Sequence, residues 1–211
     1  MKAFVAGSTG AVGRTVVRIG RERGVDLVPH ARPTSATREG TVDPQAVVFS
    51  LADVDALAAA MQGCTTVFQL IGTRRSRFAA GESYASSDVG TTRSLVEAAK
   101  TAKVGHFVLL SSVGAGRPVG PYLQAKAEAE ALVLSSGIPY TIVRPSAFSG
   151  EGHWVPPGLG VLTRALRLHS YRPVTVEQLA EGLLRVAVDG RPLGILEGKS
   201  LWDHLDRSST G

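Results

Sequence analysis

The chain opens with a short apolar segment that runs directly into three evenly spaced glycines. Residues 1–6 are almost entirely apolar, and Gly7, Gly10 and Gly13 follow at once. A buried parallel strand has this apolar character, and a glycine turn between such a strand and a helix is typical of dinucleotide binding. One glycine lets the chain reverse, one lets the backbone approach a pyrophosphate, and one lets the helix pack closely on the strand. We therefore predict that this turn binds the phosphates of a dinucleotide with its backbone amides.

The residues of the turn that we expect at the cofactor are Gly7, Ser8, Thr9, Gly10, Ala11 and Val12. The next predicted strand, residues 25–30, leads to Arg32 and has no carboxylate at its end. An NAD enzyme places Asp or Glu there, against the ribose hydroxyls, whereas an NADP enzyme places an arginine near the 2′-phosphate. Arg32, with Arg14 as a second candidate, therefore favours NADP(H) over NAD(H). The alternative, that Arg32 is an ordinary exposed loop residue, stays open.

Strands and helices continue to alternate, which indicates parallel strands joined by right-handed crossovers. Further strands are predicted at residues 46–50, 65–71, 106–110, 140–143 and 194–196. Helices are predicted at residues 11–23 and at 54–61, the second capped by Asp53. Further helices are predicted from residue 84 or 87 to 102, from 122 onward, and at 176–188, after a capping box at Thr175 and Gln178. Residues 33–45 are expected to form a loop. The predicted fold class is α/β, a doubly wound parallel sheet of Rossmann type in one domain (1–211), with residues 145–211 forming a small C-terminal substrate lobe.

The carboxyl edge of such a sheet lies beside the ligand crevice. We therefore expect Ile71 and Gly72 to line the cofactor site, with Gly72 permitting close approach of the ribose. Pro145 is expected to close over the nicotinamide. Residues 149–160 suggest a substrate loop or lid, in which Trp154 is either a pocket wall or a packing aromatic.

Tyr122 and Lys126 are four positions apart in a predicted helix and therefore share one helix face. A tyrosine hydroxyl has a pKa of about 10 when unperturbed, and an adjacent ammonium stabilises the phenolate and brings the value toward neutral. The same lysine can hold the nicotinamide ribose. Ser112 would bind the substrate oxygen, with Ser111 as the alternative because neighbouring residues leave a strand in opposite directions. A surface tyrosine with a lysine one turn on also arises by chance, but the preceding paired serines favour a catalytic set.

Several segments together resemble the short-chain dehydrogenase/reductase superfamily: the glycine turn, residues 109–115, Tyr122-x-x-x-Lys126 and residues 142–145. The glycine spacing and the short length resemble its atypical members. Residues 122–126 and 196–199 are similar to the Tat-interacting-protein-like oxidoreductases. The resemblance implies NADP(H) as the cofactor and Ser112, Tyr122 and Lys126 as the proton-relay set. Two departures are Ser50, where many relatives have an aspartate near the adenine, and a short C-terminal part.

The function that this pattern favours is hydride transfer to or from a carbonyl-type small molecule. The alternative is a non-catalytic NADP(H)-binding sensor or regulatory module, as in the NmrA-like members. The intact set of Ser112, Tyr122 and Lys126 favours the enzyme, because a sensor does not need it.

The composition of the chain argues against several kinds of partner and bound group. No apolar run reaches the ~18 residues of a membrane span, and the glycine turn begins too early for a signal peptide. Cys64 is the single cysteine, which excludes an internal disulfide, and the five histidines show no paired spacing that would indicate a metal site. We expect a cytoplasmic monomer or homodimer that acts on a small molecule, without a membrane partner.

The net charge of +5 comes from arginines scattered along the chain, with one dense run at residues 74–77. The absence of a DNA-binding motif argues against a nucleic-acid partner and favours solvated loop charge. A second basic group forms either a rim for an acidic substrate or a solvated helix face: Arg164, Arg167, His169 and Arg172.

Overall fold

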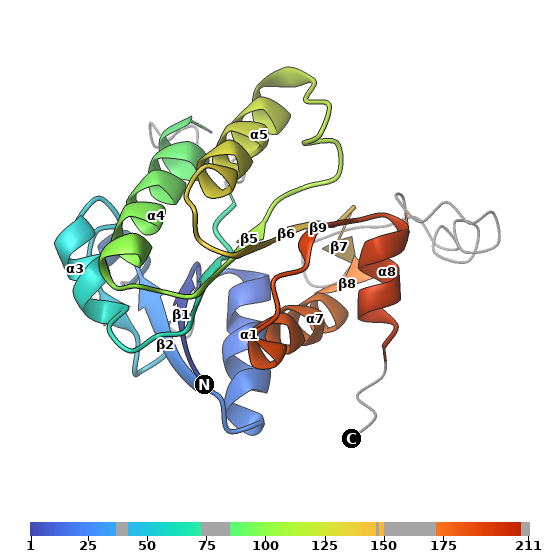
Figure 1. Cartoon of the computed structure of the whole chain (residues 1–211). Helices are drawn as coiled ribbons and strands as arrows, with labels where there is room; N and C mark the ends of the chain where they lie inside the picture. The colour runs from blue at the N-terminus through green and yellow to red at the C-terminus, as the bar shows by residue number, and fades with distance from the viewer. Residues whose placement is uncertain (37–41, 73–84, 147, 150–171, 208–211) are drawn as a thin grey trace.

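The computed structural model describes residues 1–36, 42–72, 85–146, 148–149 and 172–207, which form a central parallel sheet with helices on both faces (Figure 1). The strand order is β3-β2-β1-β4-β5-β6-β9, and every pair is parallel. The strands are β1 (Lys2–Ala6), β2 (Asp26–Ala31), β3 (Val47–Val48), β4 (Thr66–Gln69), β5 (His106–Leu110), β6 (Tyr140–Arg144) and β9 (Gly194–Glu197). The order reverses between β1 and β4, which is the switch point where doubly wound folds bind ligands. The predicted fold class is confirmed.

Two apolar clusters fill the space between the sheet and the helices. The helices on one side are α1 (Ala11–Glu22), α7 (Val176–Asp189) and α8 (Lys199–Leu205), and those on the other are α3 (Val54–Ala60), α4 (Thr91–Thr101) and α5 (Gly120–Leu134). In β1, Ala3 and Val5 belong to the first cluster and Phe4 and Ala6 to the second. A strand covered on both faces is apolar throughout, which explains the opening run.

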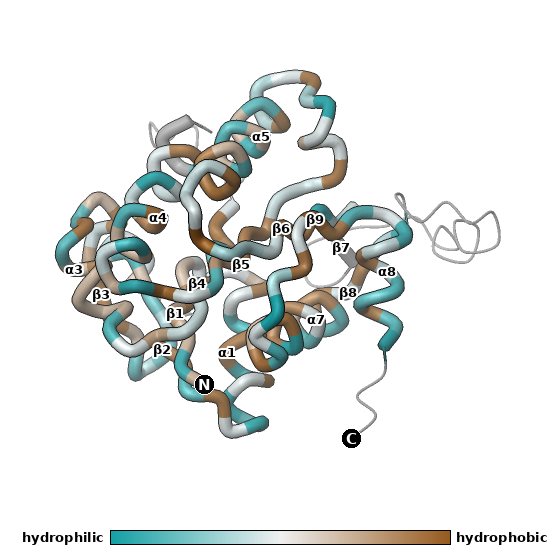
Figure 2. Tube along the Cα trace, viewed as in Figure 1, coloured by the Kyte–Doolittle hydropathy of each residue, from teal (hydrophilic) through white to brown (hydrophobic). Residues whose placement is uncertain are grey.

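The flanking helices are amphipathic. Figure 2 shows hydrophilic and hydrophobic stretches alternating along α4, α5 and α7. In α1, Val12, Val16 and Ile19 are buried, whereas Arg14 and Arg18 are exposed. This stripe packs the helix against the sheet and against α7.

The predicted helix boundaries are confirmed where the sequence contains a specific cap. The Asp53 carboxylate accepts from the Ala56 amide (2.9 Å) at the start of α3. Thr175 and Gln178 form the expected capping box, and α7 ends before Gly190 at φ +60°. Trp202 is buried in α8.

Several elements differ from the sequence-based expectation. A single helical turn, α2 (Pro33–Ala36), replaces the start of the predicted loop, because Pro33 favours the first helical position and the Arg32 carbonyl accepts from the Ser35 and Ala36 amides. A π-helical turn, η2 (Ala85–Gly90), precedes α4. A short parallel pair, β7 (Phe148–Ser149) and β8 (Val174–Thr175), was not predicted, and neither was α8. None of the helices in the described ranges combines the length and apolarity needed to cross a bilayer.

Candidate functional site

The glycine turn lies at the switch point and is held by close backbone packing. Gly7 has φ +92°, and a Cβ there would lie 2.9 Å from the backbone carbonyl carbon of Leu70, the residue after β4. A Cβ on Gly13 would lie 2.1 Å from the Gly7 carbonyl oxygen. A Cβ on Gly10 would meet that oxygen at 3.4 Å, so the protein's own packing constrains this position least. The chain reversal at Gly7 and the close helix packing at Gly13 match their expected roles.

The N-terminus of α1 suits an anionic group. Gly10 is the N-cap and provides no side-chain hydrogen bond, and the first turn has no acidic residue. The buried Ser8 hydroxyl instead donates to the His30 carbonyl oxygen (2.8 Å), which ties the turn to β2. Free first-turn amides and the positive end of the helix dipole attract a phosphate. The turn therefore fits the pyrophosphate of a dinucleotide.

The carboxyl end of β2 has aromatic and basic residues. His30 is buried between Phe4 and Phe49, with Nε2 3.0 Å from the Phe49 carbonyl oxygen, and burial lowers its pKa. Arg32 follows the strand and is half-buried, while the exposed Arg14 donates from Nη1 to the Thr9 carbonyl oxygen (2.9 Å). Both candidate arginines thus lie close to the glycine turn or the end of the strand beside it.

Ser50, which stands where the family resemblance implies an aspartate, accepts from the Ala52 amide (3.2 Å). Its hydroxyl therefore stabilises the turn that leads into α3.

A buried polar chain ties the end of β4 to η2. The Ile71 amide donates to Gln69 Oε1 (2.7 Å), and Gln69 Nε2 donates to Thr92 Oγ1 (3.1 Å). Thr92 Oγ1 donates in turn to the Asp88 carbonyl oxygen (2.6 Å). At Gly72 a Cβ would meet no described protein atom within 4 Å, so packing among the described residues does not demand glycine there.

Lys126 is buried and has a partner that the sequence did not reveal. Its Nζ lies 2.6 Å from Asp88 Oδ1 and donates to the Leu110 carbonyl oxygen at 3.4 Å. Asp88 projects from the π-helical turn, a local widening that often marks functional sites. In the sequence Asp88 is a lone acidic residue before a helix, and neither its burial nor the π-turn has a sequence signal.

Tyr122 and Ser112 lie at the start of α5 and just after the end of β5. Tyr122 lies in the first turn of α5 and is 36% exposed. A Cβ on Gly114 would be 3.1 Å from the Leu123 side chain, so the start of α5 packs on the turn that follows Ser112. Ser112 is half-buried, and its Oγ makes a long contact (3.4 Å) with the Val113 carbonyl oxygen.

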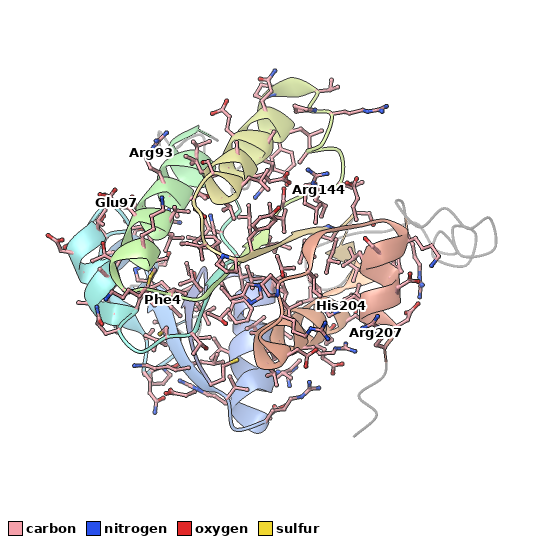
Figure 3. All side chains as sticks on the ribbon, in the orientation of Figure 1. Phe4, Arg93, Glu97, Arg144, His204 and Arg207 are labelled. Atoms are coloured by element: carbon pink, nitrogen blue, oxygen red, sulfur yellow. The ribbon has the colours of Figure 1, made fainter. Side chains whose placement is uncertain are left out.

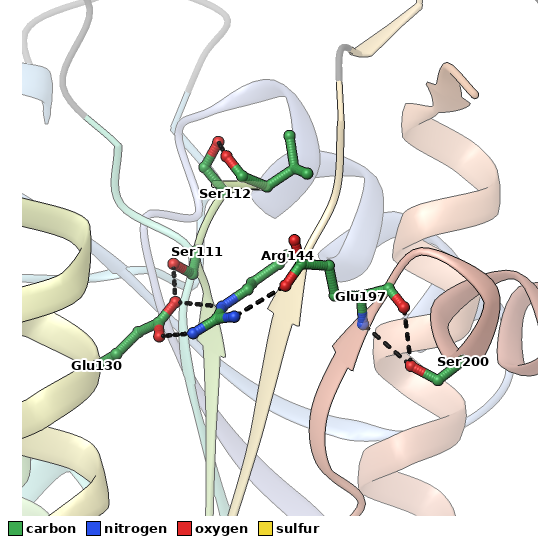
Figure 4. A network of polar contacts seen from close by, with 7 residues as sticks. Ser111, Ser112, Glu130, Arg144, Glu197 and Ser200 are labelled. Carbon is green, nitrogen blue, oxygen red and sulfur yellow. Dashed lines mark hydrogen bonds and ion pairs between the residues drawn. The ribbon is translucent and has the colours of Figure 1, made fainter. Parts of the chain in front are cut away.

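Ser111, the alternative to Ser112, belongs to a different network (Figure 4). Its hydroxyl donates to Glu130 Oε1 (2.5 Å). Both Glu130 oxygens also accept from Arg144, whose Nη1 donates to Glu197 (2.8 Å). Ser111 thus belongs to a buried ionic cluster, whereas the Ser112 hydroxyl, among the described residues, contacts only the Val113 carbonyl oxygen. Glu130 falls one turn beyond Lys126 on α5, but nothing in the sequence indicated that it would pair with Arg144.

Other predicted site residues have different outcomes. The carbonyl oxygen of Pro145 accepts from the Val113 amide (2.9 Å), which fixes Pro145 beside Ser112. Arg172 lies 3.5 Å over the Trp202 ring and 3.2 Å from Asp206, so it packs on α8. Ser149, the first residue of the predicted loop 149–160, ends β7. The remaining predictions lie outside the described residues: residues 150–160 with Trp154, the basic run 74–77, and Arg164, Arg167 and His169. Among the residues that are described, no cluster of His, Cys, Asp or Glu could hold a metal ion.

Comparison with known proteins identifies related sequences and folds. Residues 7–189 match the family model described as NAD(P)H-binding. Protein TIC 62 of Pisum sativum chloroplasts is 31% identical over 67% of this chain and 32% of its own length. The chloroplastic divinyl chlorophyllide a 8-vinyl-reductase of Oryza sativa subsp. indica is 33% identical over 84% of the chain and 48% of its own length. The chain thus spans from a third to half of these relatives.

The fold comparison agrees. The Bordetella bronchiseptica enzyme WbmH, solved in complex with NAD+, superposes with a TM-score of 0.69 over 92% of this chain and 73% of that one, at 22% identity. At this identity the likeness shows the fold alone. The match of the family model over most of the chain, with a glycine turn that fits a dinucleotide, shows that the chain belongs to the NAD(P)H-binding family and is of the atypical short-chain dehydrogenase/reductase type.

Proposed function

We propose that the protein is an NADP(H)-dependent oxidoreductase that transfers hydride to or from a carbonyl-type small molecule. The observation that carries this proposal is the approach of α5 to the carboxyl end of β5. Lys126 Nζ reaches the carbonyl of Leu110, two residues before Ser112. Tyr122 precedes Lys126 by one turn on the same helix face.

Each of these side chains has a role that its surroundings permit. The Ser112 hydroxyl orients the substrate oxygen by a hydrogen bond, and the Tyr122 hydroxyl exchanges a proton with that oxygen. The Lys126 ammonium, fixed by Asp88, supplies positive charge one turn from the tyrosine. The glycine turn would hold the pyrophosphate, and the bound nicotinamide supplies the hydride chemistry.

The choice of NADP(H) rests on Arg32 and Arg14. No carboxylate occurs in residues 29–36, where an enzyme specific for NAD has one near the end of the second strand. WbmH was solved with NAD+, so a cofactor test on this chain must compare both nucleotides.

The direct test measures turnover of an aldehyde, ketone and quinone panel with NADPH, for wild type and Tyr122→Phe. Phenylalanine keeps the ring and removes only the hydroxyl, so we expect turnover to fall by ~10²–10⁴ while NADPH affinity is unchanged. Tyr140→Phe, at the opposite end of β6, is the matched control and should retain activity. Full activity in Tyr122→Phe would exclude the tyrosine. No turnover by wild type, with cofactor binding intact, is the result that the NmrA-like alternative predicts.

A further inference from the structure

Residues 142–145 and 196–199, two segments of the family resemblance that have no role in the proposed chemistry, meet at the carboxyl edge of the sheet. Arg144 ends β6 and Glu197 ends β9, and the two are register partners. Continuing the β5–β6 register by one residue beyond Leu110 and Val143 pairs Ser111 with Arg144. Ser111, Arg144 and Glu197 therefore form one row across three neighbouring strand ends (Figure 4).

Glu130 contacts two members of this row from α5, the helix that covers this part of the sheet. It accepts from the Ser111 hydroxyl (2.5 Å) and from Nε (2.9 Å) and Nη2 (2.5 Å) of Arg144. The hydrogen bonds to Glu130, and then those to Glu197, raise the pKa of Arg144, so its guanidinium stays charged. A Cβ on Gly116 would lie 2.7 Å from Arg144 Nη1, so the loop that follows Ser112 also packs on this guanidinium.

The backbone connects this cluster to Ser112. The Ser111 amide donates to the Val143 carbonyl oxygen (2.8 Å), and the Val113 amide donates to that of Pro145 (2.9 Å). Ser112 therefore lies between two hydrogen bonds that end on either side of Arg144. Pro145 has no amide hydrogen and cannot extend the ladder. The position of Ser112 thus depends on the end of β6, which the Arg144 side chain fixes in place.

We propose that Arg144 and Glu197 are positioning residues for Ser112, and that their ion pair makes the β9–α8 segment part of the support of the reactive serine. Its catalytic consequence rests on the proposed function, but the positioning itself does not. Glu197 is the residue to change, because its side chain is 33% exposed and its loss leaves Arg144 paired with Glu130. Glu197→Gln should therefore fold.

The first readout is amide hydrogen exchange, which needs no turnover. In Glu197→Gln, exchange at Ser111 and Val113 should rise about tenfold, as expected when a charge-assisted hydrogen bond is lost, while the β1 amides are unchanged. Asp203→Asn is the matched control, since it removes a carboxylate on α8 whose ion-pair partner is the exposed Lys199. Unchanged exchange at Ser111 and Val113 would overturn the proposal whatever the activity.

The second readout separates positioning from a general structural role. Glu197→Gln should lower kcat about tenfold with the KM for NADPH unchanged, because small displacements of an orienting group affect the reacting geometry. In a Ser112→Ala background the same substitution should cause no further loss, because it acts through Ser112. Additive losses would contradict the proposal. If exchange changes but wild type turns over no carbonyl compound, the proposed function fails and the positioning of Ser112 stands.

Discussion

The ammonium of Lys126 lies 2.6 Å from the carboxylate of Asp88, and both side chains are almost completely buried. The pair joins α5 to the π-helical turn η2. The polar chain from Gln69 through Thr92 also ends on Asp88, so the lysine is tied to the end of β4 as well. A buried ammonium is strongly destabilising without a counter-charge. Asp88 therefore holds the Lys126 side chain at the carboxyl edge of the sheet.

Removing one partner of this pair should be costly. Asp88→Asn is expected to lower the free energy of unfolding by about 3–5 kcal/mol, because it leaves the Lys126 ammonium buried without a counter-charge. Lys126→Met should have a similar cost, and the double variant should lose less than the sum, as measured by urea denaturation. The control is Glu97→Gln, whose side chain is exposed on α4 and points away from the sheet (Figure 3). Strictly additive costs would contradict the coupling.

The cofactor preference provides a second prediction. NADPH should bind more tightly than NADH by about tenfold or more, because a charge-assisted contact to the 2′-phosphate contributes about 1.5–3 kcal/mol. Arg32→Ala should remove most of this difference and leave NADH affinity nearly unchanged. Fluorescence titration with each nucleotide measures the two affinities, and Arg18→Ala, on the exposed face of α1, is the control. Equal affinities in the wild type would exclude the role of Arg32 and the preference for NADP(H).

Acid should destabilise the fold through buried neutral histidines. Burial lowers the pKa of His106 from 6.5 to about 4. Among the described residues, its buried Nδ1 has no hydrogen-bond acceptor that would stabilise the protonated ring. Burial also lowers the pKa of His30 and of His204. Because these values are depressed in the folded state, the unfolded chain binds protons first as the pH falls below about 6.5. The free energy of unfolding therefore decreases progressively below that pH. For His106 alone, the decrease from neutral pH to pH 4 is about 3 kcal/mol.

The measurement is the free energy of unfolding at several values between about pH 7 and pH 5, for wild type and His106→Gln. The variant has one titrating group fewer, so its stability should fall less steeply with acid. Parallel pH profiles for the two proteins would show that His106 is not the group responsible.

The sequence predicted the features that depend on local chemistry. Glycine spacing, the capping box at Thr175 and the strand–helix alternation are local, and each is confirmed by the fold. The ionic contacts of the site could not be predicted in this way. Asp88 and Lys126 are far apart in the chain, and so are Arg144 and Glu197; only the sheet register and the packing of α5 bring them together. The hydrogen bond of Ser111 to Glu130 likewise has no signal in the sequence, and the assignment of Ser112 as the reactive serine stays a prediction.

That assignment leads to the last prediction. Ser112→Ala removes a half-buried hydroxyl that lies a long 3.4 Å from the Val113 carbonyl oxygen, so the free energy of unfolding should change by less than about 0.5 kcal/mol. Turnover should fall by ~10²-fold or more, since the hydroxyl that orients the substrate oxygen is lost. Ser111→Ala removes a buried donor to Glu130 and should cost about 1–3 kcal/mol of stability.

The substitution that costs more stability should cost less turnover. Ser111→Ala leaves the Arg144 contacts with Glu130 and Glu197 in place, so Ser112 is displaced only slightly and turnover falls by less than in Ser112→Ala. Denaturation and steady-state kinetics on the same two preparations give both numbers for each serine. If Ser111→Ala abolished turnover without loss of stability while Ser112→Ala stayed active, the reactive hydroxyl would be Ser111. The buried cluster around Glu130 would then have to open to admit a substrate.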